Sequence, residues 1–159
     1  MSKIYSNIFL IDQVNSLASL KKIFSRQHKE LLPHVKKDEN LVDGMPDSEK
    51  YFFYTWKEIG EVEELKVPKI GNIDEEEIIL FQKAIANIEY TKRKRFDDSG
   101  NFLPKADRVN DSDVDLLFFE KDRKIYVLIL TSNEYNVRRV KALIGEHNIS
   151  FTGCVNNFV

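Results

Sequence analysis

The sequence predicts an α/β fold, or an α+β variant of it, in which a mixed central sheet carries helices on both faces. Residues 74–95 begin with four acids, repeat apolar residues at helical spacing and end with four bases, as an amphipathic helix does. Residues 114–119 and 124–130 are two β-rich apolar runs separated by charged residues, which predicts a hairpin. Residues 133–145 again show helical spacing and end in glycine. A helix, a hairpin and a second helix in this order indicate helices packed on a sheet.

The N-terminal region, residues 1–70, predicts a strand, a helix and a second strand. The segment KIYSNIFLI is strand-like, a helix runs from about residue 15 to residue 31, and the aromatic segment KYFFYTWKEI is a second strand. Residues 36–49 are polar and predict a loop, and residues 61–72 predict a connector. We therefore expect an N-terminal strand-helix-strand extension and an α/β core over residues 71–159, together in one compact domain.

The predicted helix that starts at residue 74 has several features of helix ends. Asp74 and Glu77 have the spacing of a capping box, and the following apolar residues trace one helical face. These residues are Ile78, Phe81, Ile85 and Ile88. In the hairpin, both faces of the run YVLILT are apolar, so this strand is expected to lie in the middle of the sheet, covered on both sides. The segment ISFTGCV predicts a last strand.

Composition and charge exclude several classes of protein. The 42% hydrophobic residues provide enough apolar surface for a core, and 24 Lys and Arg against 26 Asp and Glu leave a net charge of -2. Without a global excess of basic residues, nucleic-acid binding would require a local patch. A single Cys154 and three scattered histidines offer no zinc site and no internal disulfide. We find no signal peptide and no apolar run long enough to span a membrane, so the chain is expected to be cytoplasmic.

The segment DSDVDLLFF, residues 111–119, is the main candidate for chemistry. Asp113 and Asp115 stand one residue apart where the chain enters an apolar strand, so both carboxylates would lie on one face of it. Such a pair can hold Mg²⁺ for phosphoryl transfer. The alternative is structural, because Asp and Ser favour turns and remain solvated at the ends of strands. We favour the structural interpretation, in which the chain binds no metal and no cofactor.

The segment DVDLLFFEKDRKIYVLILTS resembles the central hairpin of the PD-(D/E)xK restriction-endonuclease-like superfamily, and the resemblance covers about residues 74–155. In that family an acid opens one strand, and an acid and a lysine on the next strand complete a magnesium site. Asp113 or Asp115 matches the first acid, but the next strand has only Leu128, Ile129, Leu130 and Thr131 at the required positions. The resemblance therefore implies a degenerate nuclease-like core that cannot cut DNA.

The segment SDVDLL also resembles the Asp-x-Asp strand of minimal nucleotidyltransferases, over about residues 99–119. That family places a Gly-Ser pair before the two aspartates and a third carboxylate on a later strand. Here Gly100 is followed by Asn101, and the apolar partner strand offers no carboxylate. A third carboxylate would have to come from a distant segment such as Glu61–Glu64. This resemblance implies a Mg²⁺-dependent enzyme that uses Asp113 and Asp115.

Two basic clusters are candidates for nucleic-acid binding. The segment YTKRKRF places Lys92, Arg93, Lys94 and Arg95 between aromatics, and the last predicted helix carries Arg138, Arg139 and Lys141. Cations neutralise phosphates, and flanking aromatic rings can stack on unpaired bases. The alternative is that the first cluster only complements the macrodipole at the C-terminus of its helix. The aromatic stripe from Tyr51 to Trp56 is expected to pack in the core, and any exposed half of it would suit a partner protein.

Together these observations predict a non-catalytic, nuclease-like module that binds nucleic acid or a partner protein. The family resemblance implies work in prokaryotic defence or in a mobile element. Two alternatives remain open. One is a Mg²⁺-dependent nucleotidyltransferase or nuclease, and the other is a pure protein-interaction domain of a larger assembly.

Overall fold

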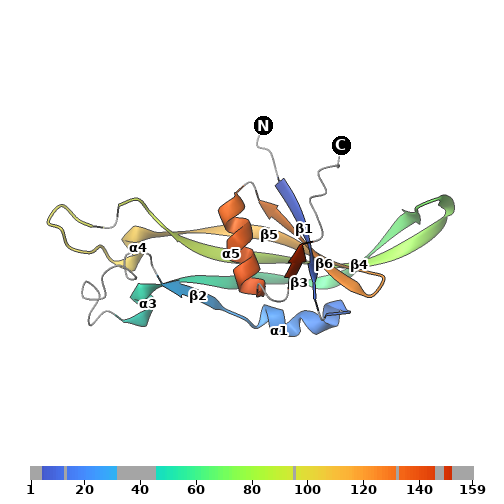
Figure 1. Cartoon of the computed structure of the whole chain (residues 1–159), viewed down its shortest axis with the longest axis horizontal. Helices are drawn as coiled ribbons and strands as arrows, with labels where there is room; N and C mark the ends of the chain where they lie inside the picture. The colour runs from blue at the N-terminus through green and yellow to red at the C-terminus, as the bar shows by residue number, and fades with distance from the viewer. Residues whose placement is uncertain are drawn as a thin grey trace.

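The structure, a computed structural model, is mostly β: a curled, half-barrel-like antiparallel sheet that carries a few short helices (Figure 1). It describes residues 5–12, 14–31, 46–94, 96–131, 133–145 and 149–151. The predicted α/β fold, with a mixed sheet and helices on both faces, is therefore wrong. Strands dominate because the segment predicted to be the longest helix, residues 74–95, and the segment predicted to be a connector, residues 61–72, mostly form strands.

The chain forms seven strands and a few short helical segments in the described ranges. In chain order these are β1 (Tyr5–Ile11), η1 (Leu17–Leu20), α1 (Lys21–Phe24), β2 (His28–Leu31), α3 (Asp47–Lys50), β3 (Tyr51–Lys69), β4 (Asn72–Thr91), α4 (Lys105–Arg108), β5 (Val109–Lys121), β6 (Lys124–Thr131), α5 (Glu134–Ile144) and β7 (Ile149–Phe151). The strand order in the sheet is β2-β3-β4-β5-β6-β1-β7, and each neighbouring pair is antiparallel. Residues 1–70 and residues 71–159 both contribute strands to this one sheet.

Strand β4 replaces the helix predicted over residues 74–95. It pairs with β3 on one side and with β5 on the other, from Leu80↔Glu120 to Thr91↔Val109. Its apolar side chains occur on both faces, so the sequence fits helical spacing and also fits alternation along a strand. The pairing with two neighbouring strands, which a sequence pattern does not contain, decides between the two.

The predicted connector at residues 61–72 is also wrong, because β3 continues to Lys69 and turns into β4 at Ile70 and Gly71. Gly71 has a φ of +92°, a left-handed conformation that glycine adopts without strain.

The helix predicted from about residue 15 to residue 31 is shortened to η1 and α1, and residues 28–31 form β2. The predicted loop at residues 36–49 lies largely outside the described residues.

Other sequence predictions are confirmed. Strand β1, the first part of β3 and the β5–β6 hairpin form as expected, and Asp122 and Arg123 both have positive φ in the hairpin turn, as a type I′ turn requires. Helix α5 also forms as predicted. The side chain of Asn133 accepts a hydrogen bond from the Tyr135 backbone at 2.9 Å, and Gly145 follows the helix with a φ of +107°.

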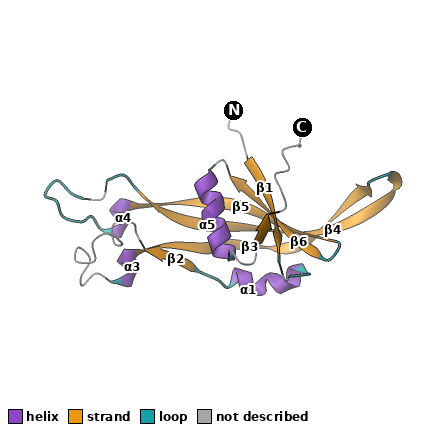
Figure 2. Ribbon diagram, in the orientation of Figure 1, coloured by secondary structure: helices purple, strands orange, loops and turns teal. Residues whose placement is uncertain are grey.

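One face of the sheet, which we term the covered face, packs against α5, η1 and α1 (Figure 2). Strand alternation assigns Tyr54, Ile88, Leu116 and Val127 to this face, and all four are buried. Trp56 is fixed from this side, because its indole N–H donates to the Ile23 carbonyl at 2.8 Å. The core therefore lies between the sheet and these helices.

The opposite face, which we term the open face, carries half-buried apolar side chains such as Leu117, Phe119, Tyr126 and Leu128. Leu130 on the same face is 38% exposed. The expectation that β6 is covered on both sides is therefore wrong, although β6 does lie between β5 and β1.

The β3–β4 hairpin extends beyond the neighbouring strands as an arm, which we define as residues 61–79 and which is two-stranded from Leu65 onward (Figure 1). Strand β5 pairs with β4 only from Leu80 onward, so residues 72–79 pair with β3 alone. The arm leaves several apolar residues exposed, namely Val62, Leu65, Ile70 and Ile78.

Candidate functional site

Asp113 and Asp115, the candidate metal ligands, lie on the open face of β5, and both are exposed. Asp113 accepts hydrogen bonds from the Lys57 ammonium at 2.5 Å and from the Asn87 amide at 2.9 Å. The Asn87 amide also donates to Asp111 at 2.6 Å. Both oxygens of Asp113 are thus engaged by side chains of β3 and β4.

These contacts shift the pKa values of both Asp113 and Lys57. Hydrogen bonds from Lys57 and then from Asn87 hold the pKa of the Asp113 carboxyl below its usual range, and Asp113 in turn raises the pKa of Lys57. A magnesium ion at Asp113 would have to displace this ammonium. Among the described residues, no three Asp, Glu, His or Cys side chains are grouped so that they could hold a metal ion.

Asp115 faces different neighbours from Asp113. It lines a hollow of about 480 Å³ over strands β3 to β6, together with Glu58, Glu63, Lys83 and Leu130. The walls of this hollow are largely apolar, and Asp113 does not line it. The two aspartates therefore do not converge on one cleft, although the sequence places them on the same face.

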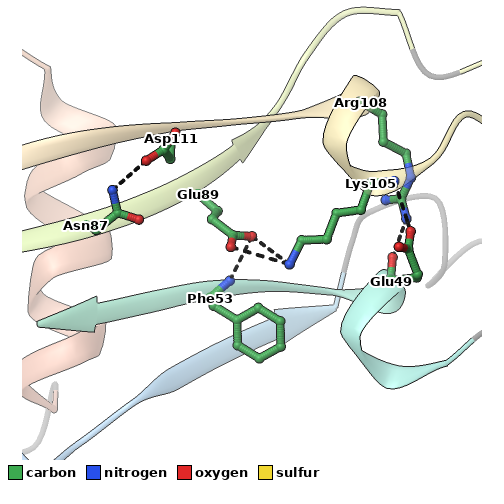
Figure 3. A network of polar contacts seen from close by, with 7 residues as sticks. All are labelled: Glu49, Phe53, Asn87, Glu89, Lys105, Arg108 and Asp111. Carbon is green, nitrogen blue, oxygen red and sulfur yellow. Dashed lines mark hydrogen bonds and ion pairs between the residues drawn. The ribbon is translucent and has the colours of Figure 1, made fainter. Parts of the chain in front are cut away.

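A second polar network, drawn in Figure 3, closes the end of the sheet that lies away from the arm in Figure 1. The guanidinium of Arg108 is fully buried, with Nη2 at 3.0 Å from a carboxylate oxygen of Glu49 and Nε donating to the Leu103 carbonyl at 2.9 Å. Lys105 forms an ion pair with Glu89 at 2.9 Å, and its ammonium lies 4.3 Å from the centre of the Phe53 ring. These contacts join α3, α4, β3 and β4, which is a structural role.

The basic segment after β4 is solvent-accessible in the described part of the chain. Lys92, Arg93 and Lys94 are all exposed, and Lys94 forms an ion pair with Asp98 at 3.8 Å. Arg95, which the sequence also predicts to bind nucleic acid, lies outside the described residues. Because β4 is a strand, the alternative role of these cations at the C-terminus of a helix is wrong.

Two arginines of α5 lie next to tyrosines at the same end of β4. The Arg139 guanidinium is 5.7 Å from the centre of the Tyr90 ring and 6.0 Å from that of Tyr135, and Arg138 is 5.4 Å from Tyr135. Arg139 also donates to the Asn136 side chain at 2.9 Å, which fixes its orientation. Tyr90 is two residues from Lys92, so Arg139 lies beside the end of β4 from which the first predicted basic cluster continues. Lys141 lies apart from this contact, because its ammonium is 4.9 Å from the centre of the Phe9 ring.

Tyr135, Arg138 and Arg139 border a cavity of about 260 Å³ between α5 and the β2–β3 edge of the sheet. We term it the Tyr–Arg groove; its lining residues are Glu30, Phe52, Tyr54, Thr91, Tyr135, Arg138, Arg139 and Ala142. At its base, the Tyr54 hydroxyl donates to Glu30 at 2.8 Å. Burial, and then Glu30, raises the pKa of Tyr54 well above its usual range, so the phenol remains protonated. At its rim, Tyr135 is 61% exposed.

Sequence reasoning identified only part of this groove. Arg138 and Arg139 were predicted to bind nucleic acid, whereas Tyr135 was not considered. Tyr135 precedes them by three and four residues, a spacing that places all three on one helical face, so the sequence pattern could have indicated it. Tyr54 was predicted to be a packing residue, and no local pattern indicates that it lies near α5. Within the aromatic stripe, Phe52 and Tyr54 are buried on the covered face and Phe53 is half-buried, which agrees with packing for this part.

Comparisons of the chain with models of protein families, with curated proteins and with solved structures gave no match. In the described residues, no helix is both long enough and apolar enough to cross a membrane.

Proposed function

We propose that this protein is a non-catalytic module that binds an unpaired nucleic-acid strand at the Tyr–Arg groove. The observation that carries the proposal is the position of Arg139 beside both Tyr90 and Tyr135. Through this contact, the basic turn of α5, which borders the groove together with the exposed ring of Tyr135, lies beside Tyr90, two residues before the exposed cations that follow β4.

The residue types suit the two chemical parts of a nucleotide. Arg138, Lys92 and Arg93 are exposed cations that can neutralise phosphates, which yields affinity that falls as salt rises. The exposed ring of Tyr135 offers a face on which a base can stack, and the neighbouring guanidiniums add planar surfaces. Glu30 is engaged by Tyr54, so the acid at the base of the groove already has a donor.

An unpaired strand fits this surface better than a duplex. The net charge of the chain is -2, and the acidic residues of the arm would repel a long polyanion that covered the whole sheet. The cavity of about 260 Å³ accommodates a side chain or a base rather than a groove-wide helix. Binding should therefore involve a few nucleotides at one end of the sheet.

Fluorescence anisotropy with short labelled single-stranded DNA and RNA tests the proposal. Tyr135→Ala should weaken binding by the loss of one stacked base, roughly 1–3 kcal/mol, whereas Tyr135→Phe should bind as the parent does. Arg138→Gln should lower the slope of log affinity against log salt by about 0.7. Lys69→Gln, which removes an exposed cation on the arm, is the matched control and should leave binding unchanged.

Two outcomes would refute the proposal. The first is the absence of salt-dependent binding to either strand type, and the second is binding that Tyr135→Ala and Lys69→Gln affect equally. If a duplex of the same length binds more tightly than the single strand, stacking on Tyr135 does not carry recognition and the proposal is again wrong.

A partner protein is the second candidate, and the open face favours it. Leu117, Phe119, Tyr126 and Leu128 form adjacent, half-buried apolar positions on β5 and β6 that none of η1, α1 and α5 covers. Binding through this face should change little with salt, in contrast to binding at the Tyr–Arg groove. Titrations at two salt concentrations therefore separate the two candidates.

A further inference from the structure

Within the described part of the chain, the outer edge of β3 is open along the arm. Strand β2 pairs with β3 only from Tyr51 to Tyr54, and within the described residues no other strand pairs with this edge. An open edge presents unpaired backbone N–H and C=O groups that can pair with another strand. The arm also extends beyond the rest of the sheet, so a second chain could approach this edge (Figure 1).

Two features that protect an edge, a break in the ladder and a proline, occur beside the centre of the arm and not within it, although Glu63, Glu64 and Lys66 place exposed charges there. Register shifts interrupt the ladder between Trp56 and Glu58 and between Ile59 and Val62, and Pro68 lacks an N–H. Between them, residues 62–67 are regularly paired with β4. In this stretch Val62 is 49% exposed and Leu65 is 50% exposed. A two-stranded ribbon with such exposed apolar residues has little stability of its own in water.

The sequence of this stretch is complementary to itself in one antiparallel register. Consider two copies whose β3 strands pair antiparallel about a two-fold axis perpendicular to the sheet. Residues that lie opposite each other must point to the same face, so the axis must pass beside a residue and not between two residues. An axis at Leu65 places Leu65 against the partner's Leu65 and Glu64 against the partner's Lys66. By symmetry the contact between Glu64 and Lys66 occurs twice.

The neighbouring registers lack this complementarity. An axis at Glu64 places Glu64 against the partner's Glu64, and an axis at Lys66 places two lysines against each other. Like charges directly opposite across two strands are destabilising, and unlike charges are stabilising. The charge pattern thus selects the axis at Leu65.

We propose that a second copy of this chain pairs with the outer edge of β3, antiparallel and with the two-fold axis at Leu65. The two arms then form one four-stranded sheet in the order β4-β3-β3-β4, and the exposed Leu65 side chains meet at its centre. This inference does not rest on the proposed nucleic-acid site, which lies at the other end of β4.

Sedimentation equilibrium of the full chain over a range of concentrations measures the dimer affinity. Variants in which the charges of residues 64 and 66 are reversed test the proposed pairing. The parent protein should be in monomer–dimer equilibrium. Lys66→Glu should weaken the dimer about tenfold or more, because it turns two attractive contacts into repulsive ones. Adding Glu64→Lys to this variant should restore the dimer, because each lysine then again faces a glutamate. Lys22→Glu, the same charge change on exposed α1, should have no effect.

Oxidative cross-linking tests the register in a Cys154→Ser background. Leu65→Cys should form a disulfide-linked dimer, because residues directly opposite on antiparallel strands have Cα atoms about 4.5–5.5 Å apart. Glu63→Cys should not, because the two copies of this residue would be offset by four positions, about 13 Å. A parent protein that stays monomeric at every concentration would overturn the proposal, as would equal cross-linking of both variants or a double charge variant that does not recover.

Discussion

Replacing Glu49 by alanine tests how the end of the sheet is held by the buried guanidinium of Arg108. Burial lowers the pKa of Arg108, and the Glu49 carboxylate, 3.0 Å from Nη2, opposes this shift. Nε bonds to the Leu103 carbonyl, Nη2 also donates to the Glu49 carbonyl, and Nη1 has no partner among the described residues. Without the carboxylate, a fully buried cation keeps only backbone carbonyls as acceptors, together with the face of Phe102.

The expected loss follows from the burial of the two partners. Removing one member of a buried ion pair costs about 3–5 kcal/mol, and the lower end applies because the Glu49 side chain is 34% exposed. The Glu49 carboxylate also accepts from the Lys105 backbone N–H at 2.9 Å, and this contact is lost as well. We therefore expect the free energy of unfolding to fall by about 3 kcal/mol. In a chain of this length that corresponds to a fall in the melting temperature of roughly 6–12 °C.

Urea unfolding followed by circular dichroism, with calorimetry for the melting temperature, measures this loss. Glu75→Ala is the matched control, because it removes the acid of an ion pair in which each side chain is 58% exposed, and it should cost about 0–1 kcal/mol. Glu49→Gln keeps an acceptor without its charge and should lose about 1.5 kcal/mol. Adding Arg108→Met to Glu49→Ala should recover stability, because it removes the unpaired cation. A loss in Glu49→Ala no larger than in Glu75→Ala would refute the reasoning.

Two further predictions concern titration. The pKa of Asp113, followed by NMR, should lie below the ordinary aspartate range. It should rise towards that range in Lys57→Met and, by a smaller amount, in Asn87→Ala. Because the folded pKa is depressed, the network stabilises the fold at neutral pH, and this contribution is lost as pH falls through the folded pKa. An unshifted Asp113 would show that its contacts with Lys57 do not persist in solution. Ultraviolet titration, with Tyr54→Phe as the difference reference, should show Tyr54 ionising at higher pH than an ordinary tyrosine, and Glu30→Gln should lower its pKa only in part because burial is the larger cause. Full reversal to the ordinary tyrosine pKa in Glu30→Gln would contradict that order of causes.

Local sequence signals predicted the elements whose determinants are local. The turn at Asp122 and Arg123 lies between two β-rich runs, and Asn133 and Gly145 mark the ends of α5, so the hairpin and the last helix form as expected. The arginines of the candidate site were predicted for a similar reason, because Arg138 and Arg139 are adjacent in one exposed turn. Tyr90 was predicted as an aromatic beside the first basic cluster and Tyr54 as a packing residue, but their positions near α5 were not predicted, because both approach α5 only once β3 and β4 have paired.

The sequence by itself determined the apolar and charged character of each segment and the position of most turns. The tertiary structure alone decided that residues 74–91 are a strand, since their apolar residues suit either spacing and the backbone bonds to β3 and β5 settle the choice. It also decided the partner of Asp113. The sequence allowed this carboxylate to bind a metal ion, whereas in the fold it accepts a hydrogen bond from Lys57. Side-chain pattern is a property of one segment, whereas hydrogen bonds between strands and charges from neighbouring strands depend on which segments meet.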